Sequence, residues 1–225
     1  MKRRLALVVL PLLLAVAGCT SGPTDDEPPP PPAAAERPSP FRDCATLSTA
    51  PTAGSPNSGT ATPASPGSGT ATPDPSGPTA PAAGGDALPE LTLSCFTGGA
   101  PVELREVAGP AVVNVWASWC PPCRKELPAF QRLSERAAGQ LQVVGVNSRD
   151  SRSGAQSIGE DFGVRFPILV DQGEALQREL KRNAIPLTLF VDADGRVRHI
   201  DATGALDDAK LAKLVRQHLG LVVPA

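Results

Sequence analysis

The chain has 225 residues and a formal net charge of −2, and 16 of its 26 prolines fall between residues 20 and 88. The remaining segment, 89–225, is long enough for one domain with its own core. This segment carries 16 basic and 16 acidic residues, and the balance, with no basic stripe, excludes a nucleic-acid-binding protein. Beyond the N-terminus no apolar run reaches the roughly 18 residues of a membrane span, which excludes a polytopic membrane protein.

The first 18 residues have the layout of an export signal. Three basic residues precede an apolar stretch at 5–17, which is too short to span a bilayer stably. The stretch ends in VAGC at 16–19, which resembles the lipobox of bacterial lipoproteins, where the cysteine is lipidated and becomes the new N-terminus. We therefore expect a signal peptide at 1–18 and a lipid anchor on Cys19. An ordinary signal peptide, with Cys19 as an incidental thiol, is the alternative.

Residues 19–88 are dominated by Pro, Ala, Ser, Thr, Gly and acidic residues. Such a composition buries too little apolar surface to offset the entropy of ordering, so we expect a disordered tether. The decapeptides at 58–67 and 68–77 are near-duplicates without an apolar face, which indicates a spacer rather than a solenoid. The tether would hold the folded domain away from a membrane.

Strand and helix patterns alternate along 89–225. The β-branched run VVNVWA at 112–117 predicts a strand buried on both faces, and further strands are predicted at 141–147, 166–170, 187–192 and 197–201. Apolar residues at helical spacing predict helices at 121–138, 154–162, 174–181 and 207–219. This alternation, closing in a hairpin, indicates an α/β fold with a central mixed sheet flanked by helices.

The sequence WCPPCRKELP begins at Trp119, where the first buried strand meets the first helix. It places Cys120 at the helix N-terminus, where unpaired N–H groups and the helix dipole favour a thiolate, so we predict that Cys120 is the nucleophile. Cys123 is close enough to form a small disulfide ring and more shielded, which fits a resolving thiol. Pro121 and Pro122 stiffen this ring at little cost. Trp119 fits packing at the rim as well as it fits a substrate contact.

A zinc site uses the same Cys-x-x-Cys spacing but needs two further ligands. Cys44 and Cys95 stand 51 residues apart, and His199 and His218 lie on a predicted strand and helix far along the chain. Redox chemistry is therefore favoured over a metal site, and it requires no bound cofactor. Because an exported chain meets oxidants, we expect a structural disulfide between Cys44 and Cys95 that holds residues 41–47 on the domain.

Three stretches resemble the TlpA/ResA branch of exported thiol-disulfide oxidoreductases in the thioredoxin superfamily. They are VVNVWASWCPPCRKELP at 112–128, FGVRFPILVD at 162–171 and AIPLTLFVDADGRV at 184–197, in the family's order and spacing. The resemblance covers about 89–220 and implies a thioredoxin-like fold. It also implies that Ile185-Pro186 is the cis-proline loop packed against the disulfide.

One position departs from cytosolic thioredoxins. The buried acid that they carry six residues before the first cysteine is Asn114 here. The ResA-like branch shares this asparagine and has a glutamate six residues after the first cysteine, matched by Glu126. We expect Glu126 to exchange protons with Cys123. A solvated helix carboxylate is the alternative.

The resemblance implies an extracytoplasmic thiol-disulfide oxidoreductase, lipid-anchored at the bacterial cell membrane. Its substrates would be protein disulfides, including those of apocytochrome c heme-attachment motifs in cytochrome c biogenesis, and an integral-membrane thiol carrier would donate electrons. We expect a monomer. The first alternative is an oxidase that introduces disulfides, which a reduction potential distinguishes. The second is a copper-binding chaperone using Cys120 and Cys123, although the loop at 182–186 offers no histidine for it.

Overall fold

The structure is a computed structural model and describes residues 37–51 and 85–224. The expected signal peptide, the expected lipidation site at Cys19 and the repeat region of the tether lie outside the described residues. In the part of the chain that the structure describes, no helix is long and apolar enough to cross a membrane.

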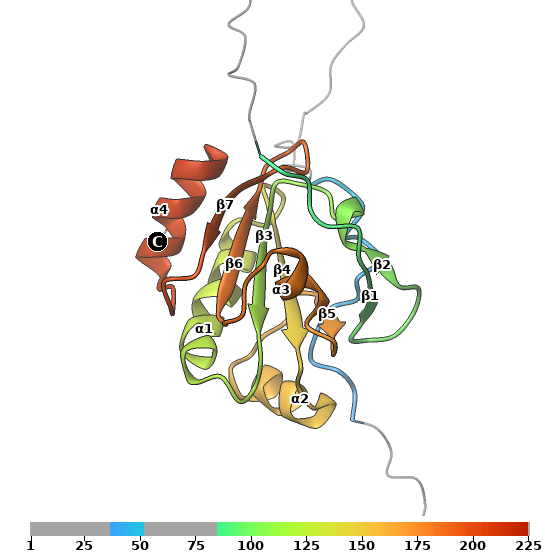
Figure 1. Cartoon of the computed structure of the whole chain (residues 1–225). Helices are drawn as coiled ribbons and strands as arrows, with labels where there is room; N and C mark the ends of the chain where they lie inside the picture. Colours follow the sequence, from blue (N-terminus) through green and yellow to red (C-terminus); the bar gives the residue numbers. More distant parts are fainter. Residues whose placement is uncertain (1–36, 52–84, 225) are drawn as a thin grey trace, which may run out of the picture. The chain divides into compact units, whose positions relative to one another are not determined.

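The described strands form one mixed sheet in the order β2-β1-β5-β4-β3-β6-β7 (Figure 1). Strands β3, β4 and β5 run parallel, and β1, β6 and β7 pair antiparallel with their neighbours. The strands are β1 (Thr92–Cys95), β2 (Val102–Glu103), β3 (Ala111–Trp116), β4 (Gln142–Ser148), β5 (Ile168–Asp171), β6 (Leu187–Val191) and β7 (Val197–Asp201). The expected mixed sheet is therefore confirmed.

Helices cover both sides of this sheet, with α1 and α3 on opposite sides (Figure 1). Helix α4 lies on the same side as α1 and packs against it. The four helices lie where the sequence predicts them, within a few residues: α1 (Pro121–Arg136), α2 (Arg152–Asp161), α3 (Ala175–Glu179) and α4 (Asp208–Leu219). The architecture confirms the expected α/β fold class.

Side chains of β3 alternate between two hydrophobic cores. Val112 and Trp116 belong to the core beneath α1 and α4. Val113 and Val115 belong to the core on the other side, which also takes Leu176 of α3. All six residues of β3 are buried, as a run of β-branched residues without polar alternation predicts. A strand fixed on both faces gives a rigid base for the residues that follow it.

The segment from Pro38 to Pro51 packs onto the domain, although its composition predicts a tether. Phe41 is 5% exposed and meets Phe96 edge to face, with ring centroids 4.8 Å apart. The sulfur atoms of Cys44 and Cys95 lie 1.96 Å apart, at disulfide distance. The compact unit that holds the sheet begins at Pro38, and it includes the residues 41–47 that the expected disulfide would hold on the domain. Composition averaged over 70 residues hides a few apolar side chains that find partners in the core.

We predict that the double substitution of Cys44 and Cys95 by serine lowers the free energy of unfolding by about 2–4 kcal/mol. A disulfide that closes a loop of 51 residues restricts the unfolded chain, and its loss also frees the segment that carries Phe41. Denaturant unfolding of both proteins, without added reductant, measures the difference. Recovery of Cys44 and Cys95 as separate free thiols in mass mapping of the native protein would contradict the pairing.

Candidate active site

Cys120 lies at the point where the chain leaves β3 and enters α1. It is the N-cap residue of α1, with extended backbone angles, and the N–H of Cys123 donates a hydrogen bond of 3.2 Å to its Sγ. The sulfur atoms of Cys120 and Cys123 lie 2.02 Å apart, as in a disulfide. Pro121 and Pro122 occupy the first turn of the helix, where a missing N–H costs nothing. The same N–H would stabilise a thiolate at Cys120 after reduction.

The two cysteines differ in access to solvent. Cys120 retains 3% of its surface and Cys123 retains none. The loop with the cis peptide bond Ile185-Pro186 immediately precedes β6, whose Leu187 pairs with Val115 near the end of β3. Chain order along this pair therefore brings Pro186 to the same end of the sheet as Cys120. Gly109-Pro110 is a second cis bond, which the sequence reasoning did not predict.

Trp119 lies at the rim of the site rather than in the core. Its side chain is 53% exposed, and its indole N–H donates to the backbone carbonyl of Arg149 over 2.9 Å. The guanidinium of Arg149 also lies 5.8 Å from the ring centroid. The exposed indole is thus fixed in place beside the disulfide and can contact a substrate.

A buried aspartate that the sequence analysis did not identify holds the segment between β3 and α1 in place. Asp150 follows β4 and accepts hydrogen bonds from the N–H and hydroxyl of Ser118, at 2.5 and 2.6 Å, and from the side-chain amide of Asn147 at 2.8 Å. It is 7% exposed. The signal available in the sequence was a polar residue just after a buried strand, at the edge where the parallel strands end.

Glu126 is fully buried on α1, so the solvated-carboxylate alternative is wrong. Its Oε1 accepts a hydrogen bond of 2.7 Å from the side-chain amide of Asn114, and its Oε2 accepts one of 3.0 Å from the N–H of Leu206. Burial raises the pKa of Glu126 to about 7, against the lowering effect of these two bonds and with a smaller raising effect from Asp201. Glu126 can therefore gain or lose a proton near neutral pH.

Asn114 links this glutamate to the sheet. It lies opposite Thr188 in the pairing of β3 with β6, and its side-chain amide donates a hydrogen bond of 3.3 Å to the hydroxyl of Thr188. Its own Oδ1 has no hydrogen-bond partner among the described residues. Glu126, Asn114 and Thr188 thus form a polar cluster inside an apolar core, one helical turn from Cys123. Sequence reasoning found the first two, and Thr188 has no signal of its own because it lies within an ordinary strand pattern.

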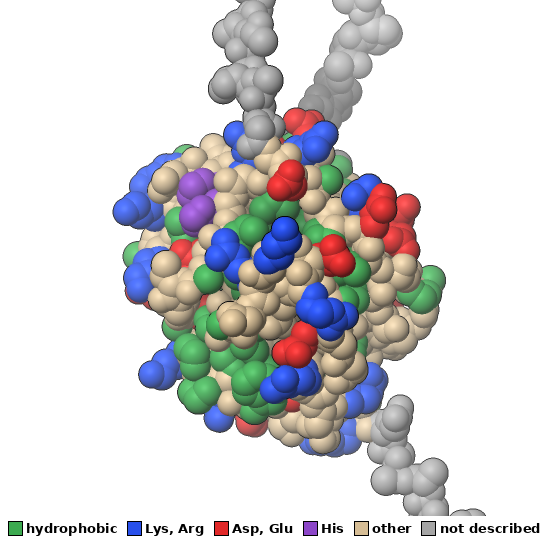
Figure 2. Space-filling view, viewed as in Figure 1, with side chains coloured by type: hydrophobic (Ala, Val, Ile, Leu, Met, Phe, Trp, Pro, Cys, Tyr) green, Lys and Arg blue, Asp and Glu red, His purple; other side chains and the backbone are tan. Residues whose placement is uncertain are grey.

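The two histidines contact each other. His199 of β7 and His218 of α4 stack with ring centroids 4.0 Å apart (purple in Figure 2). Desolvation lowers the pKa of His218, and the charges of His199 and Arg198 act in the same direction. Over residues 37–51 and 85–224, no group of three or more His, Cys, Asp or Glu is placed to hold a metal ion.

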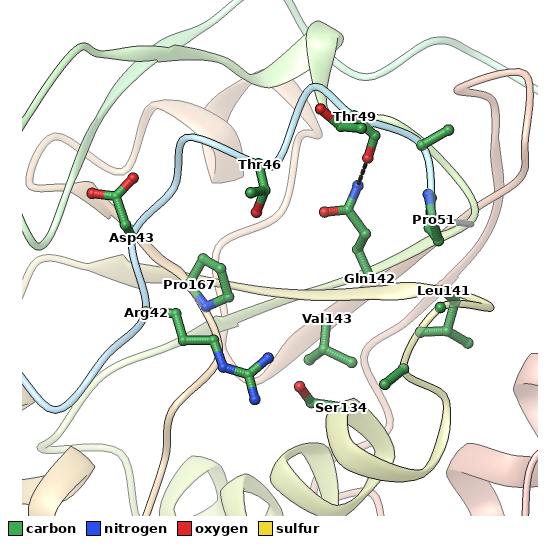
Figure 3. Close-up of a pocket in the computed structure, with 13 residues that line it drawn as sticks. Arg42, Asp43, Thr46, Thr49, Pro51, Ser134, Leu141, Gln142, Val143 and Pro167 are labelled. Carbon is green, nitrogen blue, oxygen red and sulfur yellow. Dashed lines mark hydrogen bonds between the residues drawn. The ribbon is translucent and has the colours of Figure 1, made fainter. Parts of the chain in front are cut away.

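A cavity of ≈550 Å³ opens between the segment 42–51 and the C-terminal part of α1 (Figure 3). Gln142 of β4 reaches across its upper side, where its side-chain amide donates to the backbone carbonyls of Leu47 and Thr49 over 3.1 and 3.2 Å. Neither Cys120 nor Glu126 lines this cavity. It belongs to the packing of the N-terminal segment rather than to the site around the disulfide.

The sequence profile of the Redoxin family matches residues 83–215, more than half of the chain. The chain belongs to the Redoxin family. The match runs from just before β1 into α4 and includes every candidate residue around the Cys120–Cys123 disulfide. The expected membership of the thioredoxin superfamily is thereby confirmed.

Relatives of this Redoxin-family chain include thiol-disulfide oxidoreductases. The thioredoxin-like protein YneN of Bacillus subtilis strain 168 is 30% identical over 120 residues, which are 52% of this chain and 69% of YneN. ResA of the same organism, a thiol-disulfide oxidoreductase, is 26% identical over 142 residues, 62% of this chain and 76% of ResA. A secreted thiol-disulfide isomerase from Corynebacterium glutamicum has a similar structure, with a TM-score of 0.51 and 26% identity over 59% of this chain and 83% of the isomerase. The chain is therefore a ResA-like thiol-disulfide oxidoreductase with a thioredoxin-like fold.

Proposed function

We propose that the chain reduces disulfides in protein substrates through Cys120 and Cys123, with Glu126 as the group that takes the proton of Cys123. The proposal rests on one arrangement. The disulfide lies at the N-terminus of α1, and one helical turn after Cys123 the same helix carries the buried carboxyl group of Glu126, whose pKa is about 7. A reactive thiolate and a proton acceptor are the two requirements of thiol-disulfide exchange.

The reaction begins with the reduced chain. The Cys120 thiolate attacks one sulfur of the substrate disulfide, and the other sulfur leaves as a thiolate that takes a proton from water. The Cys123 thiol then passes its proton to the Glu126 carboxylate and attacks the Sγ of Cys120. The Cys120–Cys123 disulfide forms and the second substrate thiolate leaves. Two electrons have passed to the substrate, and an external dithiol must return the chain to its reduced form.

The residues around the disulfide position the substrate in this scheme. Trp119 offers an exposed indole, and Pro121 and Pro122 keep the first turn of α1 rigid. Pro186 and the partly buried Ile185 approach from the opposite loop. In this scheme an extended substrate segment lies along the loop that holds Pro186, beside the disulfide.

The same proposal places the chain outside the cytoplasm, anchored to the membrane by a lipid on Cys19. Support comes from the export-signal pattern at 1–18, from the secreted isomerase with a similar structure and from two cysteine pairs at disulfide distance. An integral-membrane thiol carrier would then supply electrons. Disulfides of apocytochrome c heme-attachment motifs are the substrates we propose, in cytochrome c biogenesis.

The reduction potential of the Cys120–Cys123 pair tests the direction of the reaction. We expect equilibration with glutathione to give a value nearer the roughly −270 mV of thioredoxin than the roughly −120 mV of DsbA. The reduced chain should then also reduce the disulfides of insulin, followed by turbidity. A potential near that of DsbA, with no reduction of insulin, would contradict the proposal and favour the oxidase.

We predict that Cys19→Ala moves the mature chain from the membrane fraction to the soluble exported fraction. A single lipidated cysteine would provide the anchor, and its loss removes the acyl chains that would hold the processed chain at a bilayer. Fractionation of cells producing each protein, followed by immunoblotting, gives the measurement. A Cys19→Ala chain that stays on the membrane would show that the anchor lies elsewhere.

A further inference from the structure

An apolar cavity of ≈380 Å³ lies beside the start of α1, next to the disulfide. Its lining residues come from two elements: Pro121, Arg124, Lys125 and Pro128 of α1, and Phe162 at the end of α2. In Figure 2, hydrophobic side chains gather at the lower left, where Figure 1 shows α1 beginning. Three rings thus form an apolar wall that can receive a side chain of another polypeptide.

The rim of this cavity carries two positively charged side chains that form no ion pair among the described residues. Arg124 and Lys125 are exposed, and neither has an ion-pair partner among the described residues. Arg124 is the fourth residue of α1 and Lys125 the fifth, close to the helix N-terminus, where the helix dipole disfavours cations, and no acidic residue occupies the first turn. The residues four positions on are Pro128 and Ala129, so no partner along the helix compensates them.

One acidic residue, Asp161, lies beside the cavity in sequence, directly before Phe162. It is exposed and ends α2, but it does not line the cavity, whose charged lining residues are Arg124 and Lys125. The stability of α1 does not account for two adjacent cations at its N-terminus. Recognition of a partner of opposite charge does account for them.

We propose that this cavity binds the polypeptide next to the substrate's reacting cysteine, and that it selects an aliphatic or aromatic residue followed by an acidic one. The inference rests on the proposed function. Pro121 follows Cys120 directly, so a substrate joined to Cys120 presents its neighbouring residues to the cavity. The apolar side chain fills the space between the rings, and the carboxylate pairs with Arg124 and Lys125.

The test uses short peptides in which one cysteine carries a chromogenic aryl thiol as a mixed disulfide. The residues after the cysteine are Leu-Asp, Leu-Lys or Gly-Asp, and the second-order rate constant for release of the aryl thiol by the reduced chain is measured by stopped flow. For the wild type we expect Leu-Asp to react about tenfold faster than Leu-Lys and about tenfold faster than Gly-Asp. Ratios between peptides cancel any general change in the reactivity of Cys120.

Charge reversal gives the decisive comparison. Lys125→Glu should lower or invert the ratio of Leu-Asp to Leu-Lys, whereas Phe162→Ala should erase the advantage of Leu over Gly. The matched control is Arg196→Glu, which makes the same change in net charge at an exposed residue of the β6–β7 turn, at the other end of the sheet. This control should keep the wild-type ratios.

The rate constants and their ratios either support or overturn the proposed peptide preference. Equal rates for the three peptides with the wild type, or equal ratios for Lys125→Glu and Arg196→Glu, overturn the proposal while leaving the reductase function in place. If the wild type releases the aryl thiol from none of the peptides, the proposed function itself fails and the inference falls with it. Should Phe162→Ala fold poorly, the surface variant Lys125→Glu still tests the charge preference.

Discussion

Replacing Cys123 by serine is expected to arrest the reaction at the mixed disulfide. Cys120 can still attack the substrate, but no thiol is left to displace it, so turnover should fall roughly a thousandfold or more. The covalent adduct between the chain and its substrate should accumulate instead. The Cys123→Ser protein is reduced, freed of reductant and incubated with insulin, whose disulfides are the substrate. Non-reducing electrophoresis and intact mass then detect the adduct directly.

The geometry predicts which of the two cysteines forms that adduct. Cys120 is the N-cap residue, retains some exposure and receives the N–H of Cys123, whereas Cys123 is fully buried. Cys120→Ser should therefore form no adduct and should also lack turnover. The opposite pattern, an adduct with Cys120→Ser and none with Cys123→Ser, would exchange the roles of the two residues. The control replaces Cys44 and Cys95 together by serine, because their sulfur atoms lie at disulfide distance from each other rather than from Cys120 or Cys123.

The local features of the site could be predicted from the sequence because each depends on neighbours along the chain. A β-branched run followed by a Cys-Pro-Pro-Cys helix start defines where β3 ends and α1 begins, and this alone places Cys120 at a helix N-terminus. The alternation of strands and helices likewise predicts a central mixed sheet with helices beside it, although not the order of its strands. The strand β2 could not be predicted, because its two residues are too few to show the alternation of a strand.

The features that required the structure are contacts between distant parts of the chain. Leu206 donates its N–H to Glu126 across 80 residues, and Ser118 meets Asp150 across 32. No local pattern marks a backbone N–H as the partner of a buried carboxylate. The contact between Phe41 and Phe96 could not be predicted for a related reason, since the two rings are distant in sequence and meet only in the folded chain.

Glu126→Gln is expected to slow the second step of the reaction by about a hundredfold above neutral pH. The pKa of Glu126 is about 7 because burial disfavours its charge. As the pH rises through 7, the carboxylate that accepts the proton of Cys123 becomes the main form, so resolution of the mixed disulfide should accelerate over that range. Glutamine keeps the shape of the side chain and accepts no proton. Single-turnover reduction of a disulfide peptide across this pH range should show the wild-type rise and its loss in Glu126→Gln.

The same group ties the stability of the fold to pH, which provides an independent measure of its pKa. Below about pH 4.5 the carboxyl is protonated in both the folded and the unfolded chain. Between about 4.5 and 7 the folded chain keeps a proton that the unfolded chain has lost, so the stabilisation is present at low pH and disappears as the pH rises through 7. A shift of this size corresponds to about 3 kcal/mol. Denaturant unfolding of the oxidised wild type should show this loss relative to Glu126→Gln.

The two measurements separate the chemical role of Glu126 from a structural one. If Glu126 serves only the packing of α1 against Leu206 and Asn114, the substitution changes stability while the pH profile of resolution keeps its rise. If Glu126 accepts the proton of Cys123, the rise disappears and Glu126→Asp restores part of it, because a carboxylate one methylene shorter still titrates. A wild-type stability that does not depend on pH between about 4.5 and 7 beyond that of Glu126→Gln would show that the pKa is not raised, and the proton transfer would then need another acceptor.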